Sequence, residues 1–309
     1  MTLVEPRVPN LELKLPADEG VLLVQGEDRP GLVRVISTVL AELGANILSL
    51  DQYTDDADGG HFYQRAVFHV ADLAGIRPAL QTTLDKALGR GLGLTWRLAD
   101  RSAPKRVAIL ASTSDHCLLD LLWRQRRGEL PATIPMVVSN HTKVADDVRS
   151  FGIPFFHVPS PGIGERNAVE KSTAKSAAEA EILRLLTGNV DLVVLARYMQ
   201  ILSADFLQKI GVPVINIHHS FLPAFVGAAP YRKAKERGVK LIGATAHYVT
   251  EDLDEGPIIE QDVVRVTHVD TAADLQRRGA DVERAVLARA VTWHCQDRVF
   301  RNGRETVVF

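Results

Sequence analysis

Asn216, His218 and Asp254 are the residues of this chain whose types and spacing best suit catalysis. Asn216 and His218 interrupt the apolar run at residues 212–217, which is otherwise typical of a buried strand. Unpaired buried polar groups cost about 1–3 kcal/mol, and at the carboxyl ends of strands in an open α/β sheet they usually serve a ligand. A carboxamide can donate to a developing oxyanion, and an imidazole can move protons near neutral pH. Asp254 adds a carboxylate from a turn-rich loop that follows another apolar strand.

Three segments around these residues carry a family resemblance. They are Asn-Ile-His at 216–218, Ser-Phe-Leu-Pro-Ala-Phe at 220–225 and Leu-Asp-Glu-Gly-Pro at 253–257. Each residue alone could be a satisfied core group or a turn former. Together the segments resemble the active site of the formyltetrahydrofolate transformylase superfamily. The doubled His218-His219 and the N-terminal region resemble its deformylase subgroup, and the likeness runs from about Val21 onward.

The resemblance implies hydrolysis of 10-formyltetrahydrofolate to formate and tetrahydrofolate. Asn216 would hold the oxyanion, His218 would stabilise that charge and shuttle the proton, and Asp254 would orient the imidazole and help to position water. Folate is then the substrate, and no metal or redox cofactor is expected. Most formyl-transferring relatives have a proline where His219 stands. Whether His219 acts chemically or only packs is left open by the sequence.

The segment at 195–203, Leu-Ala-Arg-Tyr-Met-Gln-Ile-Leu-Ser, resembles the folate-binding loop of the same superfamily. Its apolar side chains and free backbone groups suit a flat pterin, although several of them could equally be core residues. Residues 250–254 should form the opposite wall. The expected substrate-binding residues are Arg197, Met199, Gln200, Ile201, Leu202, His219, Ser220 and Thr250.

Two rival functions share the catalytic residues. The first is a transferase that passes the formyl group to an amine, and the second is a folate or amino-acid sensor with an inactive site. The loop that begins at Ser112, Ser-Thr-Ser-Asp-His-Cys, has no glycine-rich phosphate cradle of the kind that a nucleotide acceptor needs. The intact triad argues against the sensor. Val226 and Ala229 stand where deformylases usually carry a Lys or Arg, which leaves contacts to the acidic tail of folate open.

The N-terminal part, residues 19–99, has the strand and helix pattern βαββαβ of a ferredoxin-like unit. Strands are expected at 21–25, 47–53, 62–70 and 92–98, and helices at 30–43 and 76–88. The segment Asp-Arg-Pro-Gly-Leu between the first strand and helix suits a helix start, and it also resembles ACT domains, which often bind amino acids between paired copies. The resemblance implies a homo-oligomer and an amino-acid effector such as glycine or methionine. The candidate effector residues are Asp28, Arg29, Gly31 and Leu32, with Asn46 facing them from a partner copy.

Residues 100–105 form a short polar linker, and residues 106–309 should form a Rossmann-like formyltransferase domain. Strands and helices alternate there, which predicts a mostly parallel sheet with helices on both faces. Strands are expected at 106–111, 134–139, 154–157, 190–195, 212–217, 239–250 and 257–266. Helices are expected at 116–125, 144–150 and 168–186, with a helical region at 271–299 and a loop at 159–167.

Composition excludes several classes of partner. The formal net charge of −2 gives no general attraction to nucleic acid or to acidic membranes, and no apolar run approaches the length of a membrane span. The two cysteines, Cys117 and Cys295, have no spacing suited to zinc, and the histidines form no HxxxH or HExxH motif. We expect a cytoplasmic protein without a metal centre, with a loosely packed tail before about Gly20.

Overall fold

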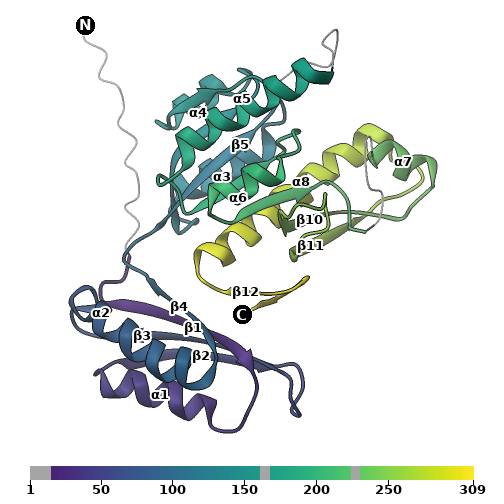
Figure 1. Ribbon diagram of the computed structural model, residues 1–309. Helices are drawn as coiled ribbons and strands as arrows, with labels where there is room; N and C mark the ends of the chain where they lie inside the picture. Colours follow the sequence, from purple (N-terminus) through teal and green to yellow (C-terminus); the bar gives the residue numbers. More distant parts are fainter. Residues whose placement is uncertain (1–14, 161–167, 224–229) are drawn as a thin grey trace, which may run out of the picture. The chain divides into compact units, whose positions relative to one another are not determined.

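The computed structural model describes residues 15–160, 168–223 and 230–309, which divide into two compact units (Figure 1). One unit consists of residues up to Pro104 with two C-terminal segments, 296–300 and 307–309, and the other contains residues 105–295 and 301–306. Residues 296–300 and 307–309, which were expected in the catalytic region 106–309, therefore belong to the N-terminal unit. The tail before residue 15, residues 161–167 of the expected loop, and Val226 and Ala229 lie outside the described residues.

The N-terminal unit contains a four-stranded antiparallel sheet with strand order β2-β3-β1-β4. Its elements are β1 (Glu19–Glu27), α1 (Leu32–Glu42), β2 (Asn46–Thr54), β3 (His61–His69), α2 (Leu73–Leu84), a π-helical turn η1 (Asp85–Arg90) and β4 (Thr95–Asp100). Apolar residues of α1, α2 and η1 pack on one face of the sheet and enclose fully buried side chains such as Phe62, Phe68 and Leu84. This confirms the expected ferredoxin-like βαββαβ arrangement.

The C-terminal segment differs from the expected helix. The helix ends at Cys295, and two short strands follow, β12 (Val299–Asn302) and β13 (Glu305–Val308). Asp297 has a positive φ of 53°, which stops the helix, and the turn between the two strands is Gly303-Arg304, where Gly303 has a φ of 57°. Within the N-terminal unit, Phe300, Val307 and Phe309 pack against the second face of the sheet, on Val21, Leu23, Tyr63 and Val67. The expectation of a helix through Val299 is therefore wrong.

The larger unit contains a seven-stranded sheet with the order β11-β10-β9-β8-β5-β6-β7. Five strands are parallel: β5 (Lys105–Ala111), β6 (Ala132–Ser139), β7 (Phe155–His157), β8 (Leu192–Ala196) and β9 (Val214–His218). Two antiparallel strands, β10 (Leu241–Tyr248) and β11 (Ile258–Arg265), extend the sheet beyond β9. The mostly parallel sheet is the one expected from the alternating pattern. Because the strand order reverses at β5, its carboxyl end opens onto the crevice where α/β proteins bind ligands.

Helices cover both faces of this sheet (Figure 1). They are α3 (His116–Arg126), α4 (Ala145–Ser150), α5 (Ala168–Leu186), α6 (Ala204–Ile210), α7 (Pro230–Glu236) and α8 (Ala272–Cys295). Apolar residues of α5 and α6 pack on β5, β6 and β8, whereas α8 packs on α3, β10 and β11. The one-to-two-turn helices α6 and α7 were not expected. Among the helices of the described segments, none combines the length and apolar character that a membrane span requires.

Candidate active site

Three polar side chains share one face of the pair formed by β9 and β10. Asn216 and His218 lie two residues apart on β9, so they point to the same side of the sheet. The antiparallel register places His247 directly opposite Asn216, and directly opposed residues share a face. Sequence analysis did not include His247. In the sequence, the signal for His247 is a single histidine in an otherwise apolar strand. In the structure, its side chain is only 2% exposed.

His247 determines how the Asn216 carboxamide is oriented. The His247 Nδ1 atom lies 2.9 Å from the backbone oxygen of Tyr248, and a carbonyl oxygen can only accept a hydrogen bond. Nδ1 therefore carries a proton, and in the neutral tautomer of this ring Nε2 is an acceptor. The Nδ2 atom of Asn216 is 3.2 Å from His247 Nε2 and donates to it. One N–H of the carboxamide is thus held by His247, and the second remains available to an oxyanion.

The side chains of His218 and Asp254 are largely buried and in contact. His218 Nδ1 is 3.1 Å from Asp254 Oδ2, and His218 Nε2 is buried with no hydrogen-bond partner among the described residues. The hydrogen bond from His218 is the main cause that holds the pKa of the Asp254 carboxyl well below its usual range, and His247 Nε2 lies 3.7 Å from the other carboxylate oxygen. Asp254 has a φ of 59°, a conformation that aspartate adopts more readily than most residues, so the loop turns its carboxylate back onto β9. The arrangement leaves Nε2 as the nitrogen that can exchange a proton with a ligand.

These groups line a cavity of about 740 Å³ at the carboxyl ends of β8 and β9. The volume lies within the range of small-molecule sites. Asn216, His218 and Asp254 stand at one end, and the exposed side chains of Met199, Ile201 and Leu253 supply apolar wall. The predicted binding residues found in its lining are Arg197, Met199, Gln200, Ile201, Leu202, His219 and Thr250.

Ser220 is the one predicted binding residue that does not line this cavity. It is 5% exposed, and its carbonyl oxygen accepts a hydrogen bond of 3.0 Å from the Thr245 hydroxyl on β10. Thr245 lies opposite His218 in the β9–β10 register. Its hydrogen bond therefore holds the segment after β9 against β10, and Ser220 is buried there. The structure therefore brings the triad and the loop residues together but leaves Ser220 in a supporting position.

Ser112 connects the end of β5 to the predicted folate loop. Its hydroxyl oxygen accepts a 3.0 Å hydrogen bond from the backbone N–H of Met199 and donates to Asn140 Oδ1 at 2.7 Å. Asn140 Nδ2 in turn lies 2.9 Å from Ser160 Oγ. The sequence identified Ser112 only through the absence of a glycine-rich loop. The structure shows that this serine fixes the backbone of the loop that lines the cavity.

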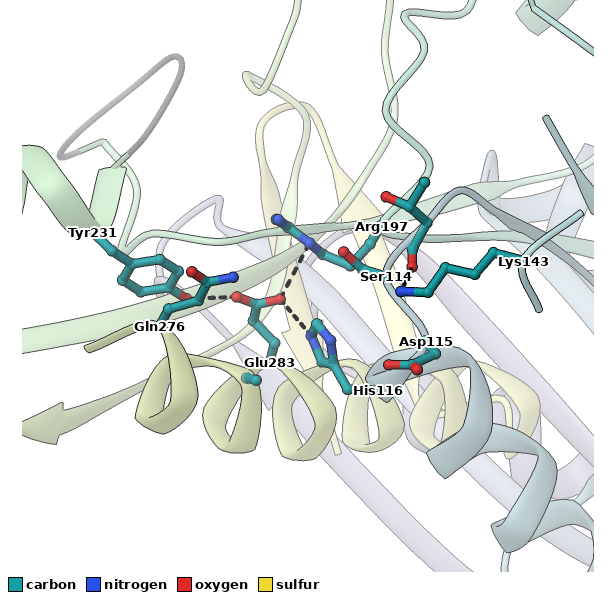
Figure 2. Close-up of a pocket in the computed structure, with 10 residues that line it drawn as sticks. Ser114, Asp115, His116, Lys143, Arg197, Tyr231, Gln276 and Glu283 are labelled. Carbon is teal, nitrogen blue, oxygen red and sulfur yellow. Dashed lines mark hydrogen bonds and ion pairs between the residues drawn. The ribbon is translucent and has the colours of Figure 1, made fainter. Parts of the chain in front are cut away.

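A buried carboxylate, Glu283 on α8, organises the polar residues beside His219 (Figure 2). Glu283 accepts from the Tyr231 hydroxyl at 2.5 Å, and its other oxygen is 2.8 Å from His116 Nε2 and 3.4 Å from Arg197 Nε. Burial by itself raises the pKa of Glu283, but the His116 hydrogen bond and the charge of Arg197 outweigh it, so the pKa lies below its usual value. This cluster could not be predicted from local sequence patterns, because its members are far apart along the chain.

His219 lies between the triad and the Glu283 cluster. Its ring centroid is 5.2 Å from that of His218 and 6.1 Å from that of Tyr231. Burial, and then the neighbouring charge of Arg197, lower the pKa of His219 to about 4. His219 is therefore a neutral imidazole near pH 7, able to accept or donate one hydrogen bond without carrying charge.

Comparison with known proteins agrees with this arrangement. The model of the formyl transferase family matches residues 105–291, and that of the ACT domain family matches residues 20–84. The fold and the site together define a formyl transferase domain joined to an ACT domain. A formyltetrahydrofolate deformylase from Mycobacterium bovis is 59% identical over 95% of this chain and 91% of its own length. One from Bacillus subtilis is 48% identical, with 94% of each chain covered.

Solved structures give the same result. The crystal structure of a formyltetrahydrofolate deformylase from Pseudomonas syringae pv. tomato has a TM-score of 0.84 and 42% identity, covering 94% of both chains. A glycinamide ribonucleotide transformylase from Symbiobacterium toebii reaches a TM-score of 0.60 at 32% identity and covers 67% of this chain and 94% of its own. The chain belongs to the formyltetrahydrofolate deformylase family, as its sequence motifs predicted.

Proposed function

We infer that this protein hydrolyses 10-formyltetrahydrofolate to formate and tetrahydrofolate. The observation that carries this function is the placement of His218 Nε2, buried and without a partner in the described part of the chain, beside the oriented Asn216 carboxamide. Both groups stand at one end of a cavity of about 740 Å³, large enough for a flat ring system. The relatives named as formyltetrahydrofolate deformylases align with 94–95% of the chain, which supports the same activity here.

The chemistry is the cleavage of an amide to an aniline-like nitrogen. A water oxygen bonds to the formyl carbon, and the carbonyl oxygen takes up negative charge. The C–N bond then breaks, the nitrogen gains a proton, and formate leaves as the carboxylate. Asn216 Nδ2 donates to the oxyanion, and loss of one such donor costs about 10²–10³-fold in turnover. His218 takes the proton of water and returns it to the nitrogen, a general acid–base contribution of about 10²–10⁴-fold.

We propose that Asp254 keeps His218 in the tautomer that this role requires. With Nδ1–H directed at the Asp254 carboxylate, Nε2 is the basic nitrogen and faces the cavity. The lowered pKa of Asp254 keeps its negative charge in place, and that charge stabilises the imidazolium formed when His218 takes up the proton.

The rival function is transfer of the formyl group to an amine. Neutral His219 beside His218 favours water as the acceptor, because it can hydrogen-bond a water molecule and fills space that a larger nucleophile needs. Purified protein with 10-formyltetrahydrofolate alone should yield formate and tetrahydrofolate in equal amounts over many turnovers. Glycinamide ribonucleotide should neither accelerate the release of folate nor become formylated. A protein that stayed inert until an amine was added would be a transferase.

We propose that no metal takes part, because the metal-ligand types that do cluster are unsuited to a cation. His116, Cys117 and Glu283 have ligand atoms within 4.8 Å of one another. Burial raises the pKa of the Cys117 thiol well above its usual value, so it stays protonated. The Arg197 guanidinium is 3.4 Å from Glu283 and repels a second cation. Folate serves as substrate, and no redox cofactor is needed for hydrolysis.

We propose that the N-terminal unit makes the enzyme a homo-oligomer that responds to an amino acid such as glycine or methionine. The candidate effector loop, 28–32, follows the end of β1, whereas Asn46 begins β2 at the opposite end of the sheet. At about 3.3 Å per residue, the nine-residue strand β1 separates them by ~25 Å within one copy. A site that contains both therefore requires a second copy.

Within the loop, the residues differ in exposure. Leu32 is buried, Asp28 is partly buried, and Gly31 has a φ of 94° at the start of α1. Arg29 is exposed and donates to the backbone oxygen of Leu92. Asp28 and Gly31 thus remain within reach of a ligand from outside the unit, and the α1 N-terminus gives a carboxylate favourable backbone N–H groups.

The β2 edge offers the surface for such pairing. β2 is the terminal strand of its sheet, and Leu48, Leu50 and Tyr53 on it are 42–49% exposed. Unpaired edge strands with apolar side chains readily add another strand. Leu50→Glu should reduce the assembly size in light scattering and abolish any amino-acid response of turnover. Val33→Glu, at an exposed apolar position on α1, is the matched control. An unchanged assembly in Leu50→Glu would place the interface elsewhere.

We propose a cytoplasmic location and a role in supplying formate to one-carbon and purine metabolism, with no nucleic-acid or membrane partner. Both cysteines are free and buried, which is typical of proteins from reducing compartments. The reaction releases formate and regenerates tetrahydrofolate, so its products serve reactions that consume these two compounds.

A further inference from the structure

A second cavity of about 280 Å³ lies next to the substrate cavity (Figure 2). It is formed by the start of α3, the loop after β6, Arg197 after β8, and α8. The two cavities share Arg197, Tyr231 and Gln276 in their linings. At the outer end of the small cavity, Thr113 and Lys143 are exposed, whereas Glu283 at its inner end is 2% exposed. The small cavity therefore adjoins the substrate cavity on one side and has exposed residues on the other.

Arg197 stands where the two cavities meet. Its side chain is 15% exposed, and its Nε lies 3.4 Å from Glu283 Oε2. In the described part of the chain, neither of its terminal nitrogens has a hydrogen-bond or ion-pair partner. A guanidinium presents parallel N–H groups that match a carboxylate in a bidentate pair. This largely buried fork is thus open to an anion on the side away from Glu283.

The backbone of Arg197 indicates that its placement is specific. Its φ is 60°, in the left-handed region that residues other than glycine, asparagine and aspartate rarely occupy. Such conformations persist where the surrounding structure enforces them, and they cluster at functional sites. Here Glu283, itself held by Tyr231 and His116, supplies the counter-charge 3.4 Å from the guanidinium, at the boundary between the cavities.

The product of hydrolysis has the chemistry that this fork binds. Formate is a one-carbon carboxylate, and it forms beside His218 while tetrahydrofolate still fills the large cavity. His218, His219 and Tyr231 follow one another at centroid distances of 5.2 and 6.1 Å, and Tyr231 contacts Glu283. This row of contacts links the catalytic histidine to the cluster in which Arg197 lies 3.4 Å from Glu283.

We propose that Arg197 binds the formate formed in the reaction and that the small cavity is the route by which formate leaves. The proposal rests on the hydrolytic function inferred above. Lys143 at the outer end, whose Nζ donates to the Thr113 backbone oxygen at 3.1 Å, provides a second positive charge along the route. The Asp115 and Glu283 carboxylates in the same lining oppose tight anion binding, as suits a product that must depart.

The test is the binding of ¹³C-labelled formate to the full-length protein in the presence of tetrahydrofolate, followed by NMR line broadening. Wild-type protein should bind formate saturably at one site. Arg197→Met should weaken binding at least ~10-fold, the range expected when a charge-assisted hydrogen bond is lost. Arg197→Lys should also weaken it, because the charge remains but the fork is gone. Arg184→Met, an exposed arginine on α5 that lines neither cavity, should bind formate like wild type.

Lys143→Met keeps the proposal testable if the Arg197 variants do not fold. Lys143 is exposed, so its loss should leave the fold intact while weakening formate binding and product inhibition by formate. Lys209→Met on α6 is its matched control. Equal binding by the wild type and the cavity variants, or no saturable binding by the wild type, would overturn the proposal. Tighter binding of inorganic phosphate than of formate through Arg197 would also overturn the proposal. It would indicate a binding site for a phosphorylated compound instead.

The outcome for this site is separable from the outcome for the proposed function. Wild-type protein that releases formate from 10-formyltetrahydrofolate but binds formate independently of Arg197 retains the function and loses the exit site. Protein that binds formate through Arg197 but releases none from the substrate loses the hydrolytic function and the product-exit role, although the anion site itself remains.

Discussion

The Asn216 carboxamide and the His247 imidazole lie directly opposite each other on β9 and β10, with Asn216 Nδ2 3.2 Å from His247 Nε2. His247 Nδ1 donates to the Tyr248 carbonyl, so in the neutral tautomer Nε2 accepts from the carboxamide. An amide that could otherwise rotate by half a turn is thereby held with its nitrogen toward the cavity. His247 is therefore a positioning residue for the group that stabilises the oxyanion.

Removing His247 should lower turnover through the orientation of Asn216. For His247→Ala we expect kcat to fall about 10–100-fold, part of the value of an oxyanion donor, while KM changes less than threefold. His247→Gln, which keeps an acceptor of similar reach, should recover a measurable part of the loss. Equal kcat for His247→Ala and wild type would show that Asn216 does not depend on His247.

His218 and Asp254 should serve chemistry more than binding. We expect His218→Ala or Asp254→Asn to lower kcat at least ~10²-fold while the affinity for tetrahydrofolate stays nearly unchanged. The physical reason is that both residues meet only the reacting end of the cavity. Tetrahydrofolate binding by calorimetry, beside steady-state kinetics, separates the two effects. Near-normal turnover in either variant would mean that the catalytic residues are wrongly assigned.

The sequence predicted the parts of this structure that strong local patterns encode. The helix expected at 168–186 matches α5 to the residue, and the alternation after residue 105 predicted the parallel sheet. The motif at 216–218 placed two members of the triad on one strand face. These features depend on residues close together along the chain, where spacing alone indicates geometry.

Features created by strand pairing and by distant contacts were not predictable in the same way. His247 joins the site through the β9–β10 register, which no local pattern specifies. Glu283 meets His116 across 167 positions of sequence. The hairpin after Cys295 was missed because apolar residues at its start continue the helical pattern, and only the positive φ at Asp297 ends it. Ser220 was expected in the cavity because the motif gives proximity but not side-chain direction.

His219 should make the folded state sensitive to mild acid. Burial, and secondly Arg197, lower its folded pKa to about 4, against an unfolded value of about 6.5. As the pH falls from about 6.5 toward 4, the unfolded chain gains a proton that the folded state does not, so the free energy of unfolding decreases.

We expect His219→Asn to lose less stability than wild type across that window, measured by urea unfolding at several pH values. Asp254 has a lowered pKa, so the stability that it contributes is lost only at lower pH, below its unfolded value of about 3.9. The titration of Asp254 therefore does not produce the loss of stability that His219 should cause at higher pH. Parallel curves of unfolding free energy against pH for the two proteins would contradict the assignment of a buried neutral imidazole.

The source of the new oxygen atom in formate tests the central claim, hydrolysis by water activated at His218, most directly. Single-turnover reactions of the full-length protein with 10-formyltetrahydrofolate in H₂¹⁸O, without any amine, should give formate that carries one oxygen from the solvent. The rate of its formation should fall at least ~10²-fold in His218→Ala. Formate without solvent oxygen, or no formate until an amine is supplied, would contradict the account.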